Sequence, residues 1–454
     1  MDKQSERWSG GSGFVLAAIG SAVGLGSIWK FPYEVGTNGG STFVIFYLLG
    51  LALIVVPLML AELAIGRRGQ SDARTSIAAV ATAHGATRNW SLIGGLGTLI
   101  AFLILSFYSV IGGWALAYAV DTVWFGLPGA QAHAVQSRFD ELLASLPRMA
   151  AYHTAFMAIT ALIVGRGITG GIERACMILM PALATLIVVL TVYALIAGDV
   201  VATLRFLFAL SPAKLTARAA LEALGLGFFS IGVGMATMIT YAAYADREIN
   251  LRNAAIVTVL ADTVISLLAG FVVFPIVFAN NLDPSSGPGL LFVTLPLAFA
   301  AMPFGAIAAI GFFVLLVLAA IGSAISMLEM PVALSRRVFG WSRAPATLVC
   351  ATACWIAGFA SVLSFNVWAT WFPLAGVPSL AKATIFDLID HLTSNLLLPV
   401  GGFALALFVG WALPQQFLRE ELRLKSATAT ILRALLRYVV PIAITMVSIA
   451  SLVL

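Results

Sequence analysis

Long apolar runs follow one another along the whole chain and are separated by short polar loops. About eleven of these runs reach the length of roughly 20 residues that a helix needs to cross a bilayer. We predict membrane-spanning helices, numbered in chain order as spans 1 to 11, at residues 13–35, 41–66, 90–124, 148–165, 172–197, 216–244, 251–280, 303–338, 344–365, 379–412 and 428–453. No polar stretch is long enough to fold alone, so we expect a single domain over residues 1–454.

The composition agrees with an integral membrane protein. Hydrophobic residues make up 61% of the chain and charged residues only 10%, whereas soluble domains carry about 25% charged residues. The basic residues concentrate in the loops on one side of the predicted spans, which places the N-terminus in the cytoplasm. The net charge of +5 therefore reflects membrane topology and does not indicate nucleic-acid binding. Span 1 is too long for a cleaved signal and contains Lys30, so we expect it in the mature protein.

Other classes of protein are poorly supported. The sequence contains no HExxH or GxSxG enzyme motif, and no ring of charges marks a channel. The three cysteines, Cys176, Cys350 and Cys354, lie in apolar runs without a nearby histidine or carboxylate, so we expect core packing and no metal site. The apolar outer loop at residues 283–303 is either a lid that dips toward the membrane or a loop on the lipid headgroups.

Two spans contain residues that an uninterrupted membrane helix avoids. Span 1 includes "GSAVGLGSIWKFPY" (20–33), and span 6 includes "GLGFFSIGVGMATMITYAAY" (225–244). These spans are five apart, so they would be equivalent helices in a transporter built from two inverted five-helix repeats. Close helix packing at small residues is the alternative for either cluster alone. Because both clusters lie at equivalent positions, we predict two interrupted helices whose freed backbone groups hold a substrate and a cation.

Five motifs resemble those of the neurotransmitter:sodium symporter family, whose bacterial members include a leucine transporter. They are "AVGLGSIWKFPY" in span 1, "NGGSTFVIFY" and "PLMLAELAIGR" in span 2, "FFSIGVGMATMITYAAY" in span 6 and "FDLIDHLTSN" in span 10. The resemblance covers essentially the whole chain. It implies an all-α polytopic fold of five-plus-five inverted repeats, at residues 13–197 and 216–412, with unwound spans 1 and 6 and an eleventh helix at residues 428–453. The implied activity is sodium-coupled amino-acid uptake by alternating access in a bacterial inner membrane. A non-transporting amino-acid sensor and a homodimer both stay open.

The resemblance places the substrate carboxylate at the break in span 1, opposite Tyr108 of span 3. Gly24 stands where amine transporters of the family have an aspartate, which leaves room for the carboxylate of an amino acid. The residues that match the family's pocket are Ala22, Gly24, Gly26, Ile104, Tyr108, Phe229, Ser230, Gly232, Met235, Ala324 and Met327. Most are apolar or small, so we expect a neutral substrate with a hydrophobic or aromatic side chain. Gly232 replaces a serine of the leucine transporter, which predicts a deeper pocket.

The first sodium site that the resemblance implies combines the Ala22 carbonyl with the side chains of Ser27, Ser230 and Asp262. A carboxylate within a span is a functional candidate, with a structural ion pair as the alternative. In chloride-dependent relatives, chloride supplies a negative charge beside this sodium. Here Asp262 would supply it, and Leu226 replaces a glutamine ligand of the chloride site, so we expect no chloride requirement.

The second sodium site that the resemblance implies is incomplete. Its carbonyls would come from Gly20, Val23 and Ala319, and its two hydroxyls from adjacent residues of span 8. Those positions hold Gly322 and Ser323, so one hydroxyl is missing. Coupling to two sodium ions, to one sodium ion, or to protons through Asp262 therefore stays open.

The outer gate of the family corresponds to Lys30 and Asp390, with Phe229 closing over the substrate beneath them. Lysine makes a point-charge contact where the family usually has the fork of an arginine, so we expect a looser gate.

The inner gate departs further from the family. Trp8 and Tyr244 match its surroundings, but the positions of the usual ion pair hold Ser5 and Arg337. A reversed pair, of Asp2 or Glu6 with Arg336 or Arg337, is our hypothesis. In span 5, Gly171 and Pro181 match the family's Gly-x9-Pro motif, which predicts either local unwinding that admits water from the cytoplasm or a static kink.

Overall fold

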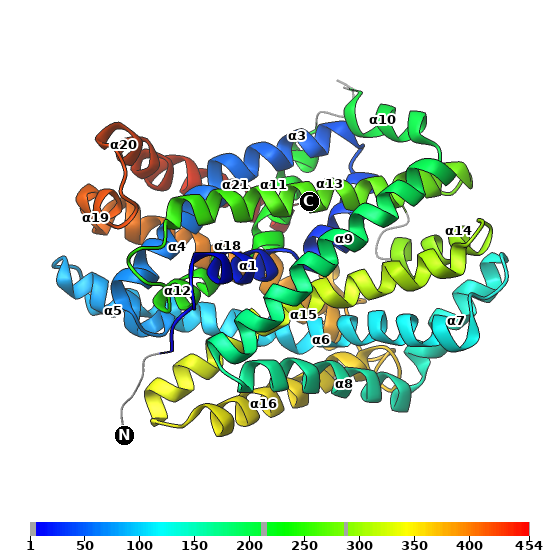
Figure 1. Cartoon of the computed structure of the whole chain (residues 1–454), viewed down its shortest axis with the longest axis horizontal. Coiled ribbons are helices and arrows are strands. Elements are labelled where there is room, and N and C mark those ends of the chain that lie inside the picture. Colours follow the sequence, from blue (N-terminus) through cyan, green and yellow to red (C-terminus); the bar gives the residue numbers. More distant parts are fainter. Residues whose placement is uncertain (1–5, 210–215, 286–288, 454) are drawn as a thin grey trace.

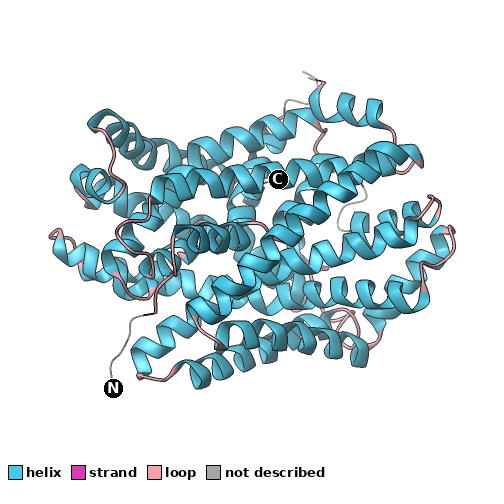
Figure 2. Ribbon diagram, viewed as in Figure 1, coloured by secondary structure: helices cyan, strands magenta, loops and turns pink. Residues whose placement is uncertain are grey.

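A computed structural model describes residues 6–209, 216–285 and 289–453, and the regular structure within these ranges is helical throughout (Figure 2). Nine helices in the described part of the chain are long and apolar enough to cross a membrane, and a pair bent by 49° between Ala22 and Gly26 adds one more span. The pair α11 and α12, which matches predicted span 6, completes the eleven. The fold is therefore the all-α polytopic arrangement that the sequence predicts.

The first half of the chain contains α1 (Gly11–Ala22), η1 (Gly26–Lys30), α2 (Phe31–Thr37), α3 (Ser41–Gly50), η2 (Leu51–Val55), α4 (Val56–Gly69), α5 (Ala73–Ala83), η3 (Arg88–Ser91), α6 (Leu92–Phe125), α7 (Ala132–Ala144), α8 (Leu146–Gly165), η4 (Ile168–Glu173), α9 (Arg174–Ala197) and α10 (Val200–Phe208). The label η marks short π-helical or 3₁₀ turns, most of which continue a neighbouring α-helix.

The second half contains α11 (Ala217–Ile231), α12 (Thr237–Ala243), α13 (Leu251–Ala279), η6 (Leu290–Thr294), α14 (Leu295–Ala300), α15 (Gly305–Phe339), α16 (Arg343–Ser364), η7 (Pro378–Leu380), α17 (Ile385–Asp390), η8 (His391–Leu397), α18 (Leu398–Leu407), η9 (Phe408–Ala412), α19 (Gln415–Glu421), α20 (Ser426–Ala434), η10 (Leu435–Val439) and α21 (Val440–Val453). The helices α6 and α15 share the largest interface and form the centre of the packing.

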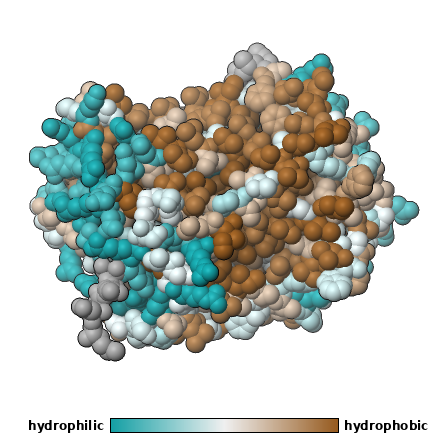
Figure 3. Space-filling view, viewed as in Figure 1, coloured by the Kyte–Doolittle hydropathy of each residue, from teal (hydrophilic) through white to brown (hydrophobic). Residues whose placement is uncertain are grey.

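The two ends of the molecule differ in polarity. The segment just before α1, together with α5, α19 and α20, lies at one end, and α7, α10 and α14 lie at the other (Figure 1). Hydrophilic side chains gather at the first of these ends, whereas an apolar surface covers the helices between the two ends (Figure 3). We call the first the inner end and the second the outer end, after the orientation that the sequence predicts. An apolar belt between polar ends is the surface that a lipid bilayer requires.

The predicted interruptions in spans 1 and 6 are confirmed. The α-helix α1 ends at Ala22, and Val23 adopts an extended conformation before the chain turns into η1. Between α11 and α12, the backbone dihedral φ is +71° at Gly232 and +93° at Gly234. Glycine has no Cβ and tolerates positive φ, so these two residues allow the chain to leave the helix in mid-span.

Some expectations about the loops need correction. Span 10 begins at Ile385 and not at residue 379, because Thr384 and Asp387 form a capping box that starts α17. The short loop helices α5, α7, α10, α14 and α19 were not predicted. The segment around η6 dips into the protein: Phe292 is 1% exposed, its ring packs on that of Trp114, and its carbonyl accepts a hydrogen bond from Tyr118. The headgroup alternative for the described part of this loop is therefore wrong.

Candidate functional site

The unwound parts of spans 1 and 6 lie against each other at the centre of the molecule. A Cβ atom at Gly26 would lie 2.8 Å from the backbone Cα of Ser230. A Cβ at Gly24 would clash with the hydroxyl of Ser323 and lie 2.8 Å from that of Tyr108. Glycine is therefore needed at both positions, because the neighbouring residues leave no room for a Cβ atom.

A small central cavity of about 20 Å³ lies between these breaks, α6 and α15. Its lining residues are Ser21, Gly24, Leu25, Gly26, Ile104, Tyr108, Phe229, Ser230, Gly232, Met235, Ser323, Ser326 and Met327. The predicted substrate residues all line it except Ala22 and Ala324. Both of these alanines are buried, and each directly follows a lining residue in the sequence. Ser21, Leu25 and Ser326 were not predicted, and Ser323 was predicted for a sodium site.

Two features give the cavity a polar side and an apolar side. The hydroxyl oxygen of Tyr108 accepts a hydrogen bond of 3.1 Å from the backbone N–H of Leu25. Its own proton therefore remains available to an acceptor in the cavity. On the apolar side, the terminal methyl of Met235 fills the space that a side chain at Gly232 would need. The extra depth expected from Gly232 is thus occupied by a flexible side chain.

A buried carboxylate lies beside the breaks. Asp262 of α13 is fully buried, and it accepts hydrogen bonds from the hydroxyls of Ser27, Tyr47 (3.1 Å) and Ser230 (3.2 Å). No basic side chain pairs with Asp262 in the part of the chain that the structure describes, so the structural ion pair is not found. The hydroxyl of Ser266, one turn further along α13, is buried without a hydrogen-bond partner among those residues. Three predicted residues, Ser27, Ser230 and Asp262, therefore form one cluster of hard oxygen atoms.

The second predicted ion site is only partly assembled. The hydroxyl of Ser323 lies 3.2 Å from the Ser21 carbonyl and 3.4 Å from the Val23 carbonyl. A Cβ at Gly322 would lie 2.6 Å from the Gly20 carbonyl and 3.3 Å from the methyl of Met180. Ala319 lies one turn before Ser323 on α15 and is buried. Next to the position of the missing hydroxyl, the structure thus has a thioether side chain.

Sequence reasoning missed the residue that stabilises the break in span 6. Glu62 of α4 is fully buried and accepts hydrogen bonds from the backbone N–H groups of Gly234 (2.8 Å) and Met238 (3.1 Å). Freed N–H groups in a membrane must find acceptors within the protein. The signal was present, because an acid within the apolar run of span 2 is itself unusual.

The outer end is open down to Phe229. Lys30 and Asp390 both line a vestibule above the central cavity, but they form no ion pair there. The Lys30 ammonium lies 4.3 Å from the centroid of the Phe229 ring, and Asp390 accepts a hydrogen bond of 2.8 Å from Ser394. Phe229 lines both the vestibule and the central cavity, so it stands between them.

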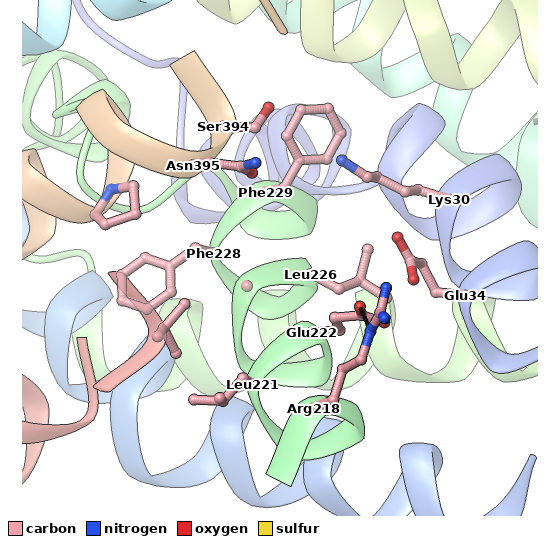
Figure 4. Close-up of a pocket in the computed structure, with 13 residues that line it drawn as sticks. Lys30, Glu34, Arg218, Leu221, Glu222, Leu226, Phe228, Phe229, Ser394 and Asn395 are labelled. Carbon is pink, nitrogen blue, oxygen red and sulfur yellow. Dashed lines mark hydrogen bonds and ion pairs between the residues drawn. The ribbon is translucent and has the colours of Figure 1, made fainter. Parts of the chain in front are cut away.

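Lys30 and Phe229 also border a second cavity at the outer end (Figure 4). Lys30 and Phe229 line it together with the ion pair of Arg218 and Glu222 on α11, in which the nitrogen–oxygen distance is 2.8 Å. Glu34 faces the same space from α2. Lys30 is thus a cation that borders two cavities.

The inner end is closed by a connected network. The Trp8 indole N–H donates to the Tyr241 carbonyl (2.8 Å), and Tyr244 donates to Glu329 (2.8 Å). Arg343 pairs with Glu329 and also with Glu6.

The reversed pair that the sequence suggested is present in part. Arg336 lies 2.8 Å from the carboxylate of Glu6. Asp2, the other acidic residue suggested for this pair, lies outside the described residues, as does Ser5. Arg343, which completes the network, was not predicted.

Span 5 departs from α-helical geometry at one of its two predicted residues. Gly171 lies in the π-helical turn η4, whereas α9 continues through Pro181. Residues of η4 hold the segment before α1: Thr169 donates to the Arg7 carbonyl (2.7 Å), and Glu173 accepts hydrogen bonds from Ser9. The start of span 5 and the start of span 1 are therefore joined.

A model described as "Sodium:neurotransmitter symporter family" matches residues 5–144 and 137–453 of this chain. The chain belongs to this family. Among its curated relatives are the "Uncharacterized sodium-dependent transporter YhdH" of Bacillus subtilis, 36% identical over 98% of this chain and 97% of the relative, and an "Uncharacterized sodium-dependent transporter" of Haemophilus influenzae, 29% identical over 99% of both chains.

A solved structure resembles this one closely. A crystal structure of MhsT in complex with L-phenylalanine is 39% identical and superposes with a TM-score of 0.90, covering 98% of this chain and 99% of that one. As a member of the sodium:neurotransmitter symporter family, the protein is a sodium-dependent, multi-pass membrane transporter and not an enzyme.

Proposed function

We propose that this symporter imports a neutral amino acid with an apolar or aromatic side chain, driven by sodium and without chloride, by alternating access between its outer and inner ends. The observation that carries the proposal is the arrangement at the two breaks. The hydroxyl of Tyr108, the oxygen cluster around Asp262 and the apolar cavity wall all meet between unwound backbone segments.

The substrate would be held by its two ends. Its carboxylate would accept the proton of the Tyr108 hydroxyl near the backbone of Gly24 and Gly26, where side chains are excluded. Its side chain would lie against Ile104 and Met327. The related MhsT structure contains L-phenylalanine, which favours an aromatic or bulky apolar side chain. Apolar walls discriminate by only about 1–3 kcal/mol per methylene, so several such amino acids should compete.

Sodium would bind at the Asp262 cluster, with Ser27 and Ser230 as further side-chain ligands and the Ala22 carbonyl from the break in span 1. The carboxylate supplies the negative charge that balances the ion within the membrane. Leu226 offers no ligand to an anion, and an ionised Asp262 repels one. Both observations support chloride-independent transport.

The test is amino-acid uptake into proteoliposomes with a sodium gradient and a panel of amino acids. Wild-type uptake should persist when gluconate replaces chloride, and Asp262→Asn should reduce it at least about tenfold in chloride-free buffer, since about 1.4 kcal/mol of sodium binding corresponds to that factor. Asp140→Asn, the same change on the exposed outer helix α7, is the matched control. Full activity of Asp262→Asn without chloride would refute the assignment. Substrate binding without uptake would support a sensor instead.

Coupling to one sodium ion is a second candidate, favoured by Gly322 and by the Met180 methyl beside it. Uptake should then depend on sodium concentration with a Hill coefficient near 1, and Gly322→Ser should raise it toward 2. The control is Gly311→Ser on the same helix, where a Cβ would make only ordinary contacts, at 3.5 Å or more. A wild-type coefficient near 2 excludes one-ion coupling. Uptake driven by a pH gradient without sodium would indicate proton coupling through Asp262.

A further inference from the structure

The inner ends of the last two spans touch at the level of their backbones. A Cβ at Gly410 of η9 would lie 2.9 Å from the Cα atom of Arg437 in η10. With the helices this close, the long side chain of Arg437 has no room between them. It lies instead along the surface of the pair.

Aromatic rings hold the Arg437 guanidinium in place. Its central carbon lies 4.0 Å from the centroid of the Trp411 ring and 5.6 Å from that of Tyr438. The indole N–H of Trp411 donates to the Arg437 carbonyl at 3.1 Å, which fixes the ring against the backbone. Trp411 is 52% exposed and Tyr438 51% exposed, so this stack lies on the outside of the protein.

Among the residues that the structure describes, the Nε–H of this guanidinium finds no acceptor. The Nε–H of Arg437 is buried without a hydrogen-bond partner, and no carboxylate pairs with this side chain within the described ranges. Arg433, one turn earlier, differs: it donates to the carbonyls of Gly410 (3.2 Å) and Leu413 (3.1 Å). A buried donor without a partner in a native protein calls for an anion or a water at that place. Because the group is charged, an anion is the better match.

The position of the stack indicates which anion. It lies where the exposed apolar surface of the last span begins, with Ile442 and Met446 exposed further along α21. Tryptophan and tyrosine are enriched at this depth, where lipid headgroups meet hydrocarbon. The surrounding segment from Trp411 to Val439 carries Arg419, Arg423, Lys425, Arg433 and Arg437 against Glu420 and Glu421. A phosphate attached to acyl chains fits both the cation and the apolar surface beside it.

We propose that Arg437, Trp411 and Tyr438 form a binding site for the phosphate of an anionic phospholipid of the leaflet at the inner end. Arg437 donates hydrogen bonds to the phosphate oxygens, and the two rings flank the glycerol. The lipid bridges the ends of spans 10 and 11. This site is independent of the substrate and sodium sites, so its test does not depend on the proposed transport activity.

The test is lipid titration of the purified full-length protein, with thermal unfolding and native mass spectrometry as readouts. Dioleoylphosphatidylglycerol should raise the melting temperature more than dioleoylphosphatidylcholine and should stay bound in the mass spectrometer. Arg437→Gln should weaken the apparent affinity for phosphatidylglycerol about fivefold, since one basic residue at a membrane surface contributes about that factor. Lys425→Gln, which removes an exposed positive charge nearby, should leave the affinity nearly unchanged.

The second variant is Trp411→Leu, which keeps Arg437 but removes the ring that holds it, and it should weaken phosphatidylglycerol binding as well. Equal effects of the two lipids on the wild type would overturn the proposal. So would wild-type affinity in Arg437→Gln or in Trp411→Leu. Equal stabilisation by soluble glycerol phosphate would show that the site takes a free anion and not a lipid.

Discussion

The outer and inner ends of the transporter both carry charged residues but use them differently. At the outer end, Lys30 and Asp390 face a vestibule without pairing with each other, and the lysine makes a cation–π contact with Phe229. At the inner end, Glu6 and Glu329 share the guanidinium of Arg343. The outer charges thus face each other across a vestibule without pairing, whereas the inner charges form a buried network.

The difference has a physical reason. Lysine is a compact, strongly hydrated charge, whereas arginine presents a planar fork that binds carboxylates in a defined geometry. Glu329 is fully buried and Arg343 nearly so, so their attraction is weakly screened. Opening the inner end must break this buried network, whereas closing the outer end only requires a side chain to move in water. The predictions below test this asymmetry, beginning with the largest expected effect.

Replacing Arg343 with methionine should open the inner end. The change leaves Glu329 buried without its cation, which costs about 3–5 kcal/mol in the closed state. In a Cys350→Ala, Cys354→Ala background, the remaining Cys176, buried beside Gly20, should react with a maleimide at least tenfold faster, as a rough lower bound. Arg337→Met, at an exposed position that forms no ion pair with a described residue, is the control. Equal rates in the two variants would show that Arg343 does not close this end.

Glu6→Gln should have a smaller effect in the same direction. It removes the charge that both Arg336 and Arg343 share but leaves the buried pair with Glu329 intact. Glu6 is 26% exposed at its side chain, so we expect a loss of about 1 kcal/mol and an increase of Cys176 labelling of about fivefold. Combining it with Arg336→Gln should give less than the sum of the two single effects. Strict additivity would argue against the reversed pair.

At the outer end, Lys30→Arg should make the two ends more alike. Lys30 and Asp390 line the same vestibule, so we expect an arginine fork to pair with the carboxylate and close the vestibule more often, by up to about 1 kcal/mol for a solvent-exposed pair. We expect the association rate of the amino acid, followed by tryptophan fluorescence, to fall by up to about fivefold with little change in melting temperature. Lys30→Met tests the charge separately. An unchanged association rate in Lys30→Arg would show that Asp390 is not its partner.

The smallest effect is expected for Ser394→Ala. The Ser394 hydroxyl donates to Asp390, and its removal frees one lone pair for Lys30. This hydrogen bond is near water, so we expect a change in the association rate of no more than about twofold. The association rate of the amino acid should change more in the double variant of Ser394→Ala with Lys30→Arg than in Ser394→Ala alone. Absence of coupling between the two positions would place Asp390 outside the outer gate.

The sequence was informative wherever a local rule has a strong signature. The glycines of spans 1 and 6 predicted the breaks because the two clusters lie at equivalent positions of two inverted repeats, where close helix packing alone is a weaker explanation. The resemblance to the family grouped Ser27, Ser230 and Asp262, and these side chains do contact one another in the structure; their role as a sodium site stays a prediction. The start of α17 was placed too early because an apolar run by itself does not show where a capping box begins the helix.

Arg343 was missed for the opposite reason. It stands at the start of α16 in a basic loop, where the positive-inside rule already explains an arginine, so the sequence offers no reason to single it out. Glu62 lies within the span 2 motif "PLMLAELAIGR" but was not predicted to have a role. The roles of both residues depend on partners far along the chain: Arg343 pairs with Glu6, and Glu62 accepts a hydrogen bond from Gly234.

The sequence by itself determined the membrane class, the spans and the two interrupted helices, because these follow from hydropathy and from the local conformational demands of glycine and proline, whereas the oxygen-bearing residues beside the breaks were assigned through the resemblance to the family. Only the tertiary structure decided which charges pair at the inner end, that Lys30 lies on Phe229, and that a methionine side chain lies beside Gly322. Those contacts join residues up to hundreds of positions apart, and each side chain has several partners of similar chemistry to choose from. The packing of the helices selects one of them.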